Sequence, residues 1–144
     1  ASKAIYYGFS VKGYKNITVF NRSRKIIKLN GANKYTKKYS TIDRYLVDAD
    51  LVINTTPTNP LNKKQTNLIR KTTVISDIVY TPKNTPFLKN FKGNKKIFGI
   101  SMLLEQAVPC FYLWFGFNPK MDNALLKKIY KKTKWQKLLV LLGG

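Results

Sequence analysis

Histidine is absent from the 144 residues, and cysteine occurs only once, as Cys110. Without histidine the chain cannot form a Ser-His-Asp triad, a Cys-His pair or the usual zinc sites. One cysteine also excludes a disulfide framework, and because Cys110 lies in the apolar run 108–115, we expect a buried free thiol in a reducing compartment. The sequence therefore predicts no metal site and no catalysis by histidine or cysteine.

Acidic residues are scarce: 6 Asp and Glu face 27 Lys and Arg, which gives a formal net charge of +21. Such a charge raises nucleic acid or an anionic surface as a partner. The lysines, however, are scattered singly and in pairs among many Asn, Ile and Tyr residues, a mixture typical of AT-rich coding. No dense basic block or RNA-binding aromatic motif accompanies them. A non-catalytic basic module that binds nucleic acid or an anionic surface is thus the alternative hypothesis, and nucleic acid is not the expected partner.

Long apolar runs are missing as well, and no signal-peptide pattern opens the chain, so a soluble cytoplasmic protein without a membrane partner is expected. The length suits one domain with its own core. The first residue is Ala1, and residues 1–7 already have the character of a helix interior with no strand or cap before them. We therefore expect a chain that is truncated at its beginning.

Apolar runs of strand length occur at residues 17–20, 50–54, 74–79 and 97–98, with a weak edge strand within 34–40. Helices are predicted at 24–30, ended by Gly31, at 86–91, at 101–115, capped by Ser101 and kinked by Pro109, and at 122–132. The helical spacing of Met102, Phe111, Trp114 and Phe115 is more typical of core residues than of cofactor contacts. Alternating strands and helices predict an α/β fold with a mostly parallel sheet and helices on both faces.

In open parallel sheets, ligands bind just beyond the carboxyl ends of the strands. The residues that fall there are Asn54, Thr55, Thr56, Asp77, Tyr80 and Gly99. For Asp77 the commoner interpretation is a carboxylate that satisfies nearby backbone amides, and Tyr80 could equally be a packing residue. Gln106 is an amide on an otherwise apolar helix, where it could bind a polyhydroxylated substrate or face solvent.

The predicted strand 17–20 is followed by Asn21, Arg22, Ser23 and Arg24. In a dinucleotide-binding fold this position reads the adenosine ribose, where an acid binds the 2′-hydroxyl of NAD and a guanidinium suits the 2′-phosphate of NADP. No acid stands here, although surface arginines in a turn would explain the same residues. Ser2, at the start of the first helix, is a candidate phosphate contact.

Five segments in the same order resemble shikimate dehydrogenase over residues 1 to about 132. Ala1-Ser2 looks like the end of that family's Gly-Gly-Ala-Ser loop, and ITVFNRS like the strand with its Asn-Arg-Thr clamp. DADLVINTTP, SDIVYTPKNTPFL and GISMLLEQAVPCFYLWFG follow, the last being similar to the Gly-Leu-Gly-Met stretch and its helix. The resemblance implies a Rossmann-like fold and the reversible, NADP-dependent reduction of 3-dehydroshikimate to shikimate in aromatic amino-acid biosynthesis.

The resemblance also implies roles for particular residues. For cofactor binding they are Ser2, Asn21, Arg22, Ser23, Arg24, Thr55, Thr56, Gly99 and Met102. For substrate binding they are Tyr80 and Gln106. The small-molecule substrate would be shikimate or 3-dehydroshikimate, while preference for quinate or for NAD stays open as a variant of the same chemistry.

Departures from the family pattern limit what is expected of this chain. Residues 1–132 would be a partial NADP-binding domain without its first strand and glycine loop, and 133–144 an apolar tail of unknown role. The family's catalytic Lys and Asp belong to a preceding substrate domain, and no residue here corresponds to them. Ser101 replaces the second glycine of Gly-Leu-Gly-Met. We expect an inactive fragment that self-associates through exposed sheet edges, and the sequence leaves a homodimer open.

Overall fold

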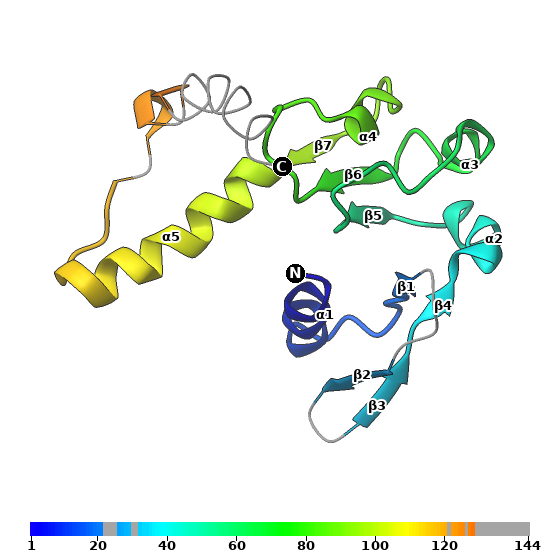
Figure 1. Cartoon of the computed structure of the whole chain (residues 1–144), viewed down its shortest axis with the longest axis horizontal. Coiled ribbons are helices and arrows are strands. Elements are labelled where there is room, and N and C mark those ends of the chain that lie inside the picture. Colours follow the sequence, from blue (N-terminus) through cyan, green and yellow to red (C-terminus); the bar gives the residue numbers. More distant parts are fainter. Residues whose placement is uncertain (22–25, 30–31, 121, 126, 129–144) are drawn as a thin grey trace, which may run out of the picture. The chain divides into compact units, whose positions relative to one another are not determined.

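The computed structural model describes residues 1–21, 26–29, 32–120, 122–125 and 127–128. The chain forms two compact units (Figure 1). The first unit comprises Ala1–Ala49 with Asn67–Arg70, and the second comprises Asp50–Thr66 with Lys71–Gly144.

The first unit opens with helix α1 (Ser2–Val11), which confirms that the chain begins in helical conformation. A short strand, β1 (Phe20–Asn21), pairs in parallel with β4 (Lys37–Lys38). The strand expected at 17–20 therefore starts later than its β-branched residues suggest. A 3-10 turn (Tyr39–Thr41) and helix α2 (Asp43–Leu46) follow.

Between β1 and β4 the expected helix at 24–30 is wrong. The chain instead forms an antiparallel hairpin of β2 (Ile26–Leu29) and β3 (Ala32–Tyr35), in which Leu29 pairs with Ala32. Two residues, Asn30 and Gly31, connect these strands; they lie outside the described residues. As sequence, Asn-Gly between apolar segments is a strong signal for a two-residue hairpin. Taking Gly31 as the end of a helix overlooked that signal.

The second unit contains three parallel strands in the order β5-β6-β7 (Figure 1). They are β5 (Leu51–Asn54), β6 (Val74–Asp77) and β7 (Lys96–Phe98). All three strands were expected, because each consists mainly of apolar and β-branched residues. Their parallel pairing confirms the α/β class predicted from the alternation of elements.

Short helices precede β6 and β7. Helix α3 (Lys63–Leu68) spans the boundary between the two units, and α4 (Pro86–Lys89) packs against β6. The hydroxyl of Thr85 accepts a hydrogen bond from the Leu88 amide at 3.2 Å, and Pro86 follows as the first helical residue. This is a complete N-cap, because proline lacks the amide hydrogen that the first turn would leave unpaired.

Helix α5 (Gly99–Phe115) follows β7 directly and continues through Pro109. It begins two residues earlier than expected, with Phe98 at the N-cap position and no side-chain cap. The prediction that Ser101 caps this helix is therefore wrong, since Ser101 is an exposed residue within the first turn. Gly99 lets the start of this helix lie close to the end of β6, because a side chain there would overlap backbone atoms.

The core of the second unit is apolar and lies between the sheet and its helices. Its buried members are Leu61, Ile75, Phe87, Leu88, Phe91, Ile100 and Leu104. Only the first half of α5 takes part, through Ile100 and Leu104 one turn apart. The helix beyond Leu104 contributes no buried residue.

Two expectations about the second half of α5 are thus wrong. Cys110 is exposed rather than buried. Phe111, Trp114 and Phe115 are also exposed, with Trp114 at 73%. Their helical spacing was real, but spacing alone does not tell which element covers a helix face. Phe111 and Phe115 instead contact each other, with ring centroids 4.8 Å apart.

The predicted helix at 122–132 is only partly within the described residues. Residues 123–125 and 127–128 are helical, and the Asp122 carboxylate accepts a hydrogen bond from the Leu125 amide at 2.8 Å. This contact is the N-cap of that segment. The apolar tail 133–144 lies outside the described residues.

Replacing Leu88 by alanine tests the core of the second unit. Leu88 is completely buried, so Leu88→Ala should lower the free energy of unfolding by about 2–5 kcal/mol, as large-to-small core changes do. The control is Leu113→Ala, because Leu113 is 79% exposed and should change stability by less than about 0.5 kcal/mol. Urea denaturation measures both, and equal losses would contradict the assigned core.

Candidate functional site

Three residues of different strands form a row at the carboxyl ends of the sheet. Asn54 pairs in register with Asp77, and Asp77 pairs with Phe98. Asn54 and Asp77 are 3% and 1% exposed, so the most buried position of β5 and one of the most buried of β6 are polar. Buried polar groups need hydrogen-bond partners, and those partners organise this edge of the sheet.

The Asp77 carboxylate accepts hydrogen bonds from three segments of the second unit. Its Oδ1 accepts from Asn54 Nδ2 at 3.2 Å and from the Val79 amide at 3.1 Å. Its Oδ2 accepts from the Thr85 hydroxyl at 2.5 Å. One carboxylate therefore joins the end of β5, the segment after β6 and the start of α4. Asp77 was expected to satisfy backbone amides, and the Val79 contact confirms that interpretation.

Asn54 extends the network into the turn that follows β5. Its Oδ1 accepts from the Thr56 amide at 3.0 Å and lies 2.8 Å from the Thr56 hydroxyl. Its Nδ2 also lies 3.2 Å from the carbonyl oxygens of Thr56 and Thr58. The Thr56 hydroxyl is thus engaged within the turn itself. Thr55, beside it, is half-buried at the end of the strand.

Gly99 brings the start of α5 against the end of β6. A Cβ atom at this position would overlap the Ile78 carbonyl group and lie 2.8 Å from the Asp77 carbonyl oxygen. Since both are backbone atoms, no side-chain movement can relieve the overlap. Only glycine fits at this close approach.

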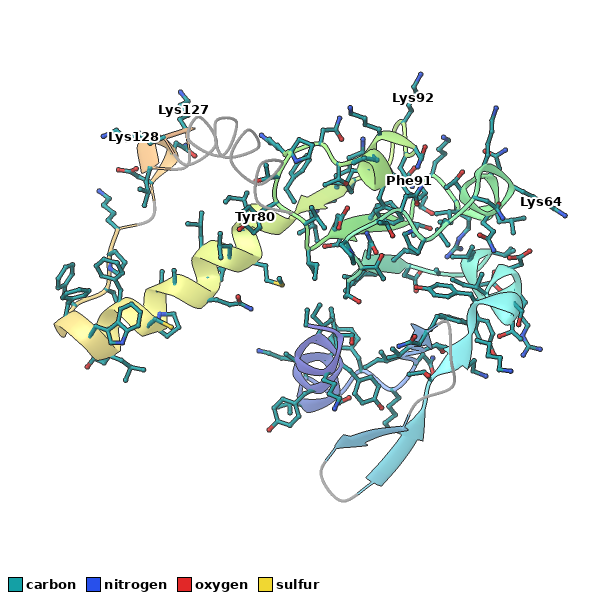
Figure 2. The ribbon with its side chains drawn as sticks, in the orientation of Figure 1. Lys64, Tyr80, Phe91, Lys92, Lys127 and Lys128 are labelled. Carbon is teal, nitrogen blue, oxygen red and sulfur yellow. The ribbon has the colours of Figure 1, made fainter. Side chains whose placement is uncertain are left out.

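The residues expected on α5 follow Gly99 along one side of the helix. Met102 and Gln106 lie three and seven residues after it, a spacing that places all three on a common face. Met102 is half-buried and Gln106 is exposed. Tyr80 is 40% exposed and lies at the end of the sheet from which α5 departs (Figure 2). The structure therefore gathers Thr55, Thr56, Tyr80 and Gly99 around the strand ends of one unit.

Ser2 and Asn21 belong to the other unit. Ser2 is the first residue of α1, with Ala1 at the N-cap position and no side-chain cap. Asn21 ends β1 and pairs in register with Lys38 of β4, so a lysine lies on the neighbouring parallel strand. The expected phosphate clamp continues with Arg22, Ser23 and Arg24, which lie outside the described residues.

Positive charge gathers around Tyr45 in the first unit. Lys37 Nζ lies 4.8 Å from the centre of the Tyr45 ring, and the Arg44 guanidinium 5.1 Å from it. A hydrogen bond from Lys37, with the nearby charge of Arg44, lowers the pKa of the Tyr45 phenol below its ordinary value. Because Lys37 is the register partner of Phe20, this cluster flanks the strand pair that ends at Asn21 and Lys38.

Within the described part of the chain, no group of three or more acidic, cysteine or histidine residues could hold a metal ion. Within the same residues, no helix has the length and hydropathy needed to cross a membrane. The groups held at the edge of the sheet are amides, hydroxyls, backbone groups and the Asp77 carboxylate. Such an arrangement can bind and orient a polar ligand.

Two of the known proteins similar to this chain are shikimate dehydrogenases. The shikimate dehydrogenase (NADP(+)) of Bartonella quintana is 36% identical, over 90% of this chain and 49% of its own length. The solved shikimate 5-dehydrogenase of Thermus thermophilus, in complex with NADP(H) and shikimate, matches 68% of this chain and 38% of its own, with a TM-score of 0.53 at 25% identity. The chain matches no protein-family model.

A further solved structure has a different cofactor. The quinate dehydrogenase of Corynebacterium glutamicum, in complex with NAD, has a TM-score of 0.53 at 28% identity, over 59% of this chain and 32% of its own. The resemblance to shikimate dehydrogenase and the Rossmann-like fold expected from the sequence are confirmed. The chain spans about half the length of the curated relatives it matches.

Sequence reasoning placed Asn54 and Asp77 at the ligand edge but gave neither a part in the binding site, and it missed Thr85. The signal for Thr85 was present: a threonine directly before a proline at the start of an apolar segment is typical of an N-cap. The hydrogen bond from Thr85 to Asp77 spans eight residues, and that from Asn54 to Asp77 spans 23. No local pattern reports contacts of that kind.

Alanine at two helical glycines should change stability in opposite directions. Gly99→Ala should cost about 1–3 kcal/mol or more, since the new methyl group overlaps backbone atoms. Gly8→Ala, within α1, should gain roughly 0.5–1 kcal/mol, because nothing lies within 4 Å of the added Cβ. Chemical denaturation of both variants checks the signs, and a neutral Gly99→Ala would rule out the close approach.

The cationic cluster predicts how Tyr45 titrates. Lys37→Met removes the ammonium group that lowers the pKa of Tyr45, so the phenol should ionise at higher pH than in the parent. Ultraviolet difference titration isolates this residue when each protein is compared with its own Tyr45→Phe derivative. An unchanged Tyr45 midpoint in Lys37→Met would show that Lys37 is not the cause.

Proposed function

We propose that this chain is the NADP(H)-binding part of a shikimate dehydrogenase, which reversibly reduces 3-dehydroshikimate to shikimate. The observation that carries the proposal is the 36% identity to a shikimate dehydrogenase (NADP(+)) over 90% of the chain. The geometry supports it, because the parallel strands end in a buried polar network at the edge where open α/β sheets bind ligands.

In this proposal each unit contributes residues that bind the cofactor. Arg22 binds the 2′-phosphate through its planar guanidinium, with Asn21, Ser23 and Arg24 beside it and Ser2 near the pyrophosphate. Thr55 and Thr56 line the path of the cofactor, and Gly99 and Met102 contact the nicotinamide. NADP(H) would supply the hydride, and the groups of this chain would bind it and orient its ring.

Tyr80 and Gln106 face the substrate in the same proposal. Both are exposed, and both come from segments next to the strand ends, where a reduced nicotinamide would meet its substrate. The hydroxyl of Tyr80 and the amide of Gln106 can each donate and accept hydrogen bonds, which suits a polyhydroxylated ring. No residue of this chain is assigned the proton transfer, so the activity belongs to the whole protein.

A second candidate is the use of NAD with quinate, and the structural similarity to a quinate dehydrogenase in complex with NAD favours testing it. The two candidates differ at the ribose. A 2′-phosphate needs cations next to Asn21, where the sequence supplies Arg22 and Arg24, whereas NAD generally needs an acid there. Nothing in the comparisons favours the nucleic-acid alternative.

Cofactor titration of the chain tests the proposal. NADPH should bind more tightly than NADH, and Arg22→Glu should weaken NADPH binding roughly tenfold to a hundredfold, the value of a charged hydrogen-bonded pair. The control is Lys64→Glu, which makes the same change in net charge at an exposed position of α3 (Figure 2). It should bind NADPH like the parent.

Two other outcomes would contradict the proposal. Preference for NADH would favour the second candidate. Tight binding to a random DNA duplex that weakens steeply with salt, without nucleotide preference, would favour a basic module, because release of counterions makes such binding strongly salt-dependent.

A further inference from the structure

Asp77 is a nearly completely buried carboxylate at the edge of the sheet, and the function proposed above gives it no role. Its three partners come from three segments: Asn54 Nδ2, the Val79 amide and the Thr85 hydroxyl. The Thr85 hydroxyl has one hydrogen and already accepts from the Leu88 amide, so it donates to Asp77. All three groups are therefore donors. Two of them reach Oδ1 and one reaches Oδ2, so both carboxylate oxygens must accept hydrogen bonds.

This acceptor determines which way the amide of Asn54 points. An asparagine side chain has one end that accepts and one end that donates. Because Asp77 can only accept, the Nδ2 end of Asn54 must face it, which turns Oδ1 toward the amide and hydroxyl of Thr56. With the opposite orientation, two oxygens would meet at Asp77 and two donors would meet at the Thr56 amide. The carbonyl oxygens of Thr56 and Thr58, each 3.2 Å from Nδ2, favour the same orientation, so the carboxylate acts together with the turn 54–58 in holding Asn54.

We propose that Asp77 is the positioning residue of the nucleotide site: acting through Asn54, it holds the turn 54–58, and through Val79 it holds the segment that leads to Tyr80. This inference rests on the proposed function and deepens it, since it names the group that keeps the cofactor-facing and substrate-facing segments in place. Asp77 itself need not touch either ligand.

The sheet contains a matched control at its opposite edge. Asn94 is 9% exposed, and its Nδ2 donates to the carbonyl oxygens of Thr73 at 2.9 Å and Lys71 at 3.2 Å. Thr73 directly precedes β6, so Asn94 joins buried backbone at the amino end of that strand, away from the ligand edge. Loss of either polar group should destabilise the unit. Only loss of Asp77 should disturb the nucleotide site.

The experiment compares four variants of the full chain with the parent: Asp77→Asn, Asn54→Ala, their double variant and Asn94→Ala. Asp77→Asn keeps the size of the side chain but places a donor among three donors. NADPH affinity is measured by titration and corrected for the folded fraction, obtained from denaturation curves. Two-dimensional NMR reports the Thr56 backbone amide, and in the parent and Asp77→Asn also the Asn54 side-chain amide.

Asp77→Asn should weaken NADPH binding at least about tenfold and shift both NMR signals. Asn94→Ala should stay within about twofold of the parent and leave the Thr56 signal in place. Asn54→Ala serves if Asp77→Asn does not fold, because it removes the link to the turn and leaves the carboxylate its other two donors. Its effect and that of Asp77→Asn should not add in the double variant, as expected for residues that act as one unit.

Unchanged NMR signals in Asp77→Asn would overturn the inference, and so would NADPH affinity equal to that of the parent. An equal loss of affinity in Asn94→Ala would show that stability, not position, determines binding, which also overturns it. If neither the parent nor Asn94→Ala binds NADPH, the proposed function fails, and the NMR comparison alone then decides whether Asp77 sets the turn.

Discussion

The edge of the sheet depends on one requirement: a carboxylate buried to 1% exposure must have its hydrogen bonds satisfied. An unpaired buried charge is too costly for a domain of ordinary stability, so the donors around Asp77 have to arrive together. They come from the end of β5, from the residues after β6 and from the cap of α4. The hydrogen bonds to the carboxylate thus connect the end of β5, the residues after β6 and the start of α4.

Gly99 adds a steric constraint to this electrostatic one. The backbone of α5 approaches the carbonyl groups of Asp77 and Ile78. Asp77 is also the residue whose side chain accepts the three hydrogen bonds. The start of α5 and the turns around Asp77 are therefore both positioned against the end of β6. Met102 and Gln106 take their places from that start, because the helical repeat determines where residues three and seven positions later lie.

The sequence predicted the elements whose pattern is strong and local. The parallel strands β5, β6 and β7 coincide with short segments rich in apolar residues, β5 and β6 end in Asn54 and Asp77, and their order implied a ligand edge. The helix predicted at 24–30 was wrong because an Asn-Gly hairpin signal competed with a weak helical pattern. The structure has the antiparallel pairing of β2 with β3 instead. Burial of Phe111, Trp114 and Phe115 failed for another reason: helical periodicity identifies a face but not its partner.

In the candidate site, too, the residues next to strongly patterned elements were predictable and those joined by contacts distant in the sequence were not. Thr55, Thr56, Tyr80 and Gly99 could be placed because each follows or opens a predictable element. The Asn54–Asp77–Thr85 network could not, because its hydrogen bonds join positions 8 and 23 residues apart that have no shared motif. The roles proposed for Arg22 and Gln106 come from side-chain chemistry at positions that the resemblance to known enzymes also singles out.

Net charge and fixed geometry make different contributions to binding, and this distinction bears on how the function is judged. A charge of +21 attracts any polyanion, at a strength that salt reduces and with little regard for chemical identity. The network at the sheet edge adds little long-range attraction or repulsion, because its one carboxylate is enclosed by its own hydrogen-bond donors. Its contribution is to hold groups in fixed positions, and fixed positions distinguish one nucleotide from another because a mismatched ligand leaves buried polar groups unpaired. Affinity for an anion alone would therefore not test the proposed function, whereas selectivity between NADPH and NADH would.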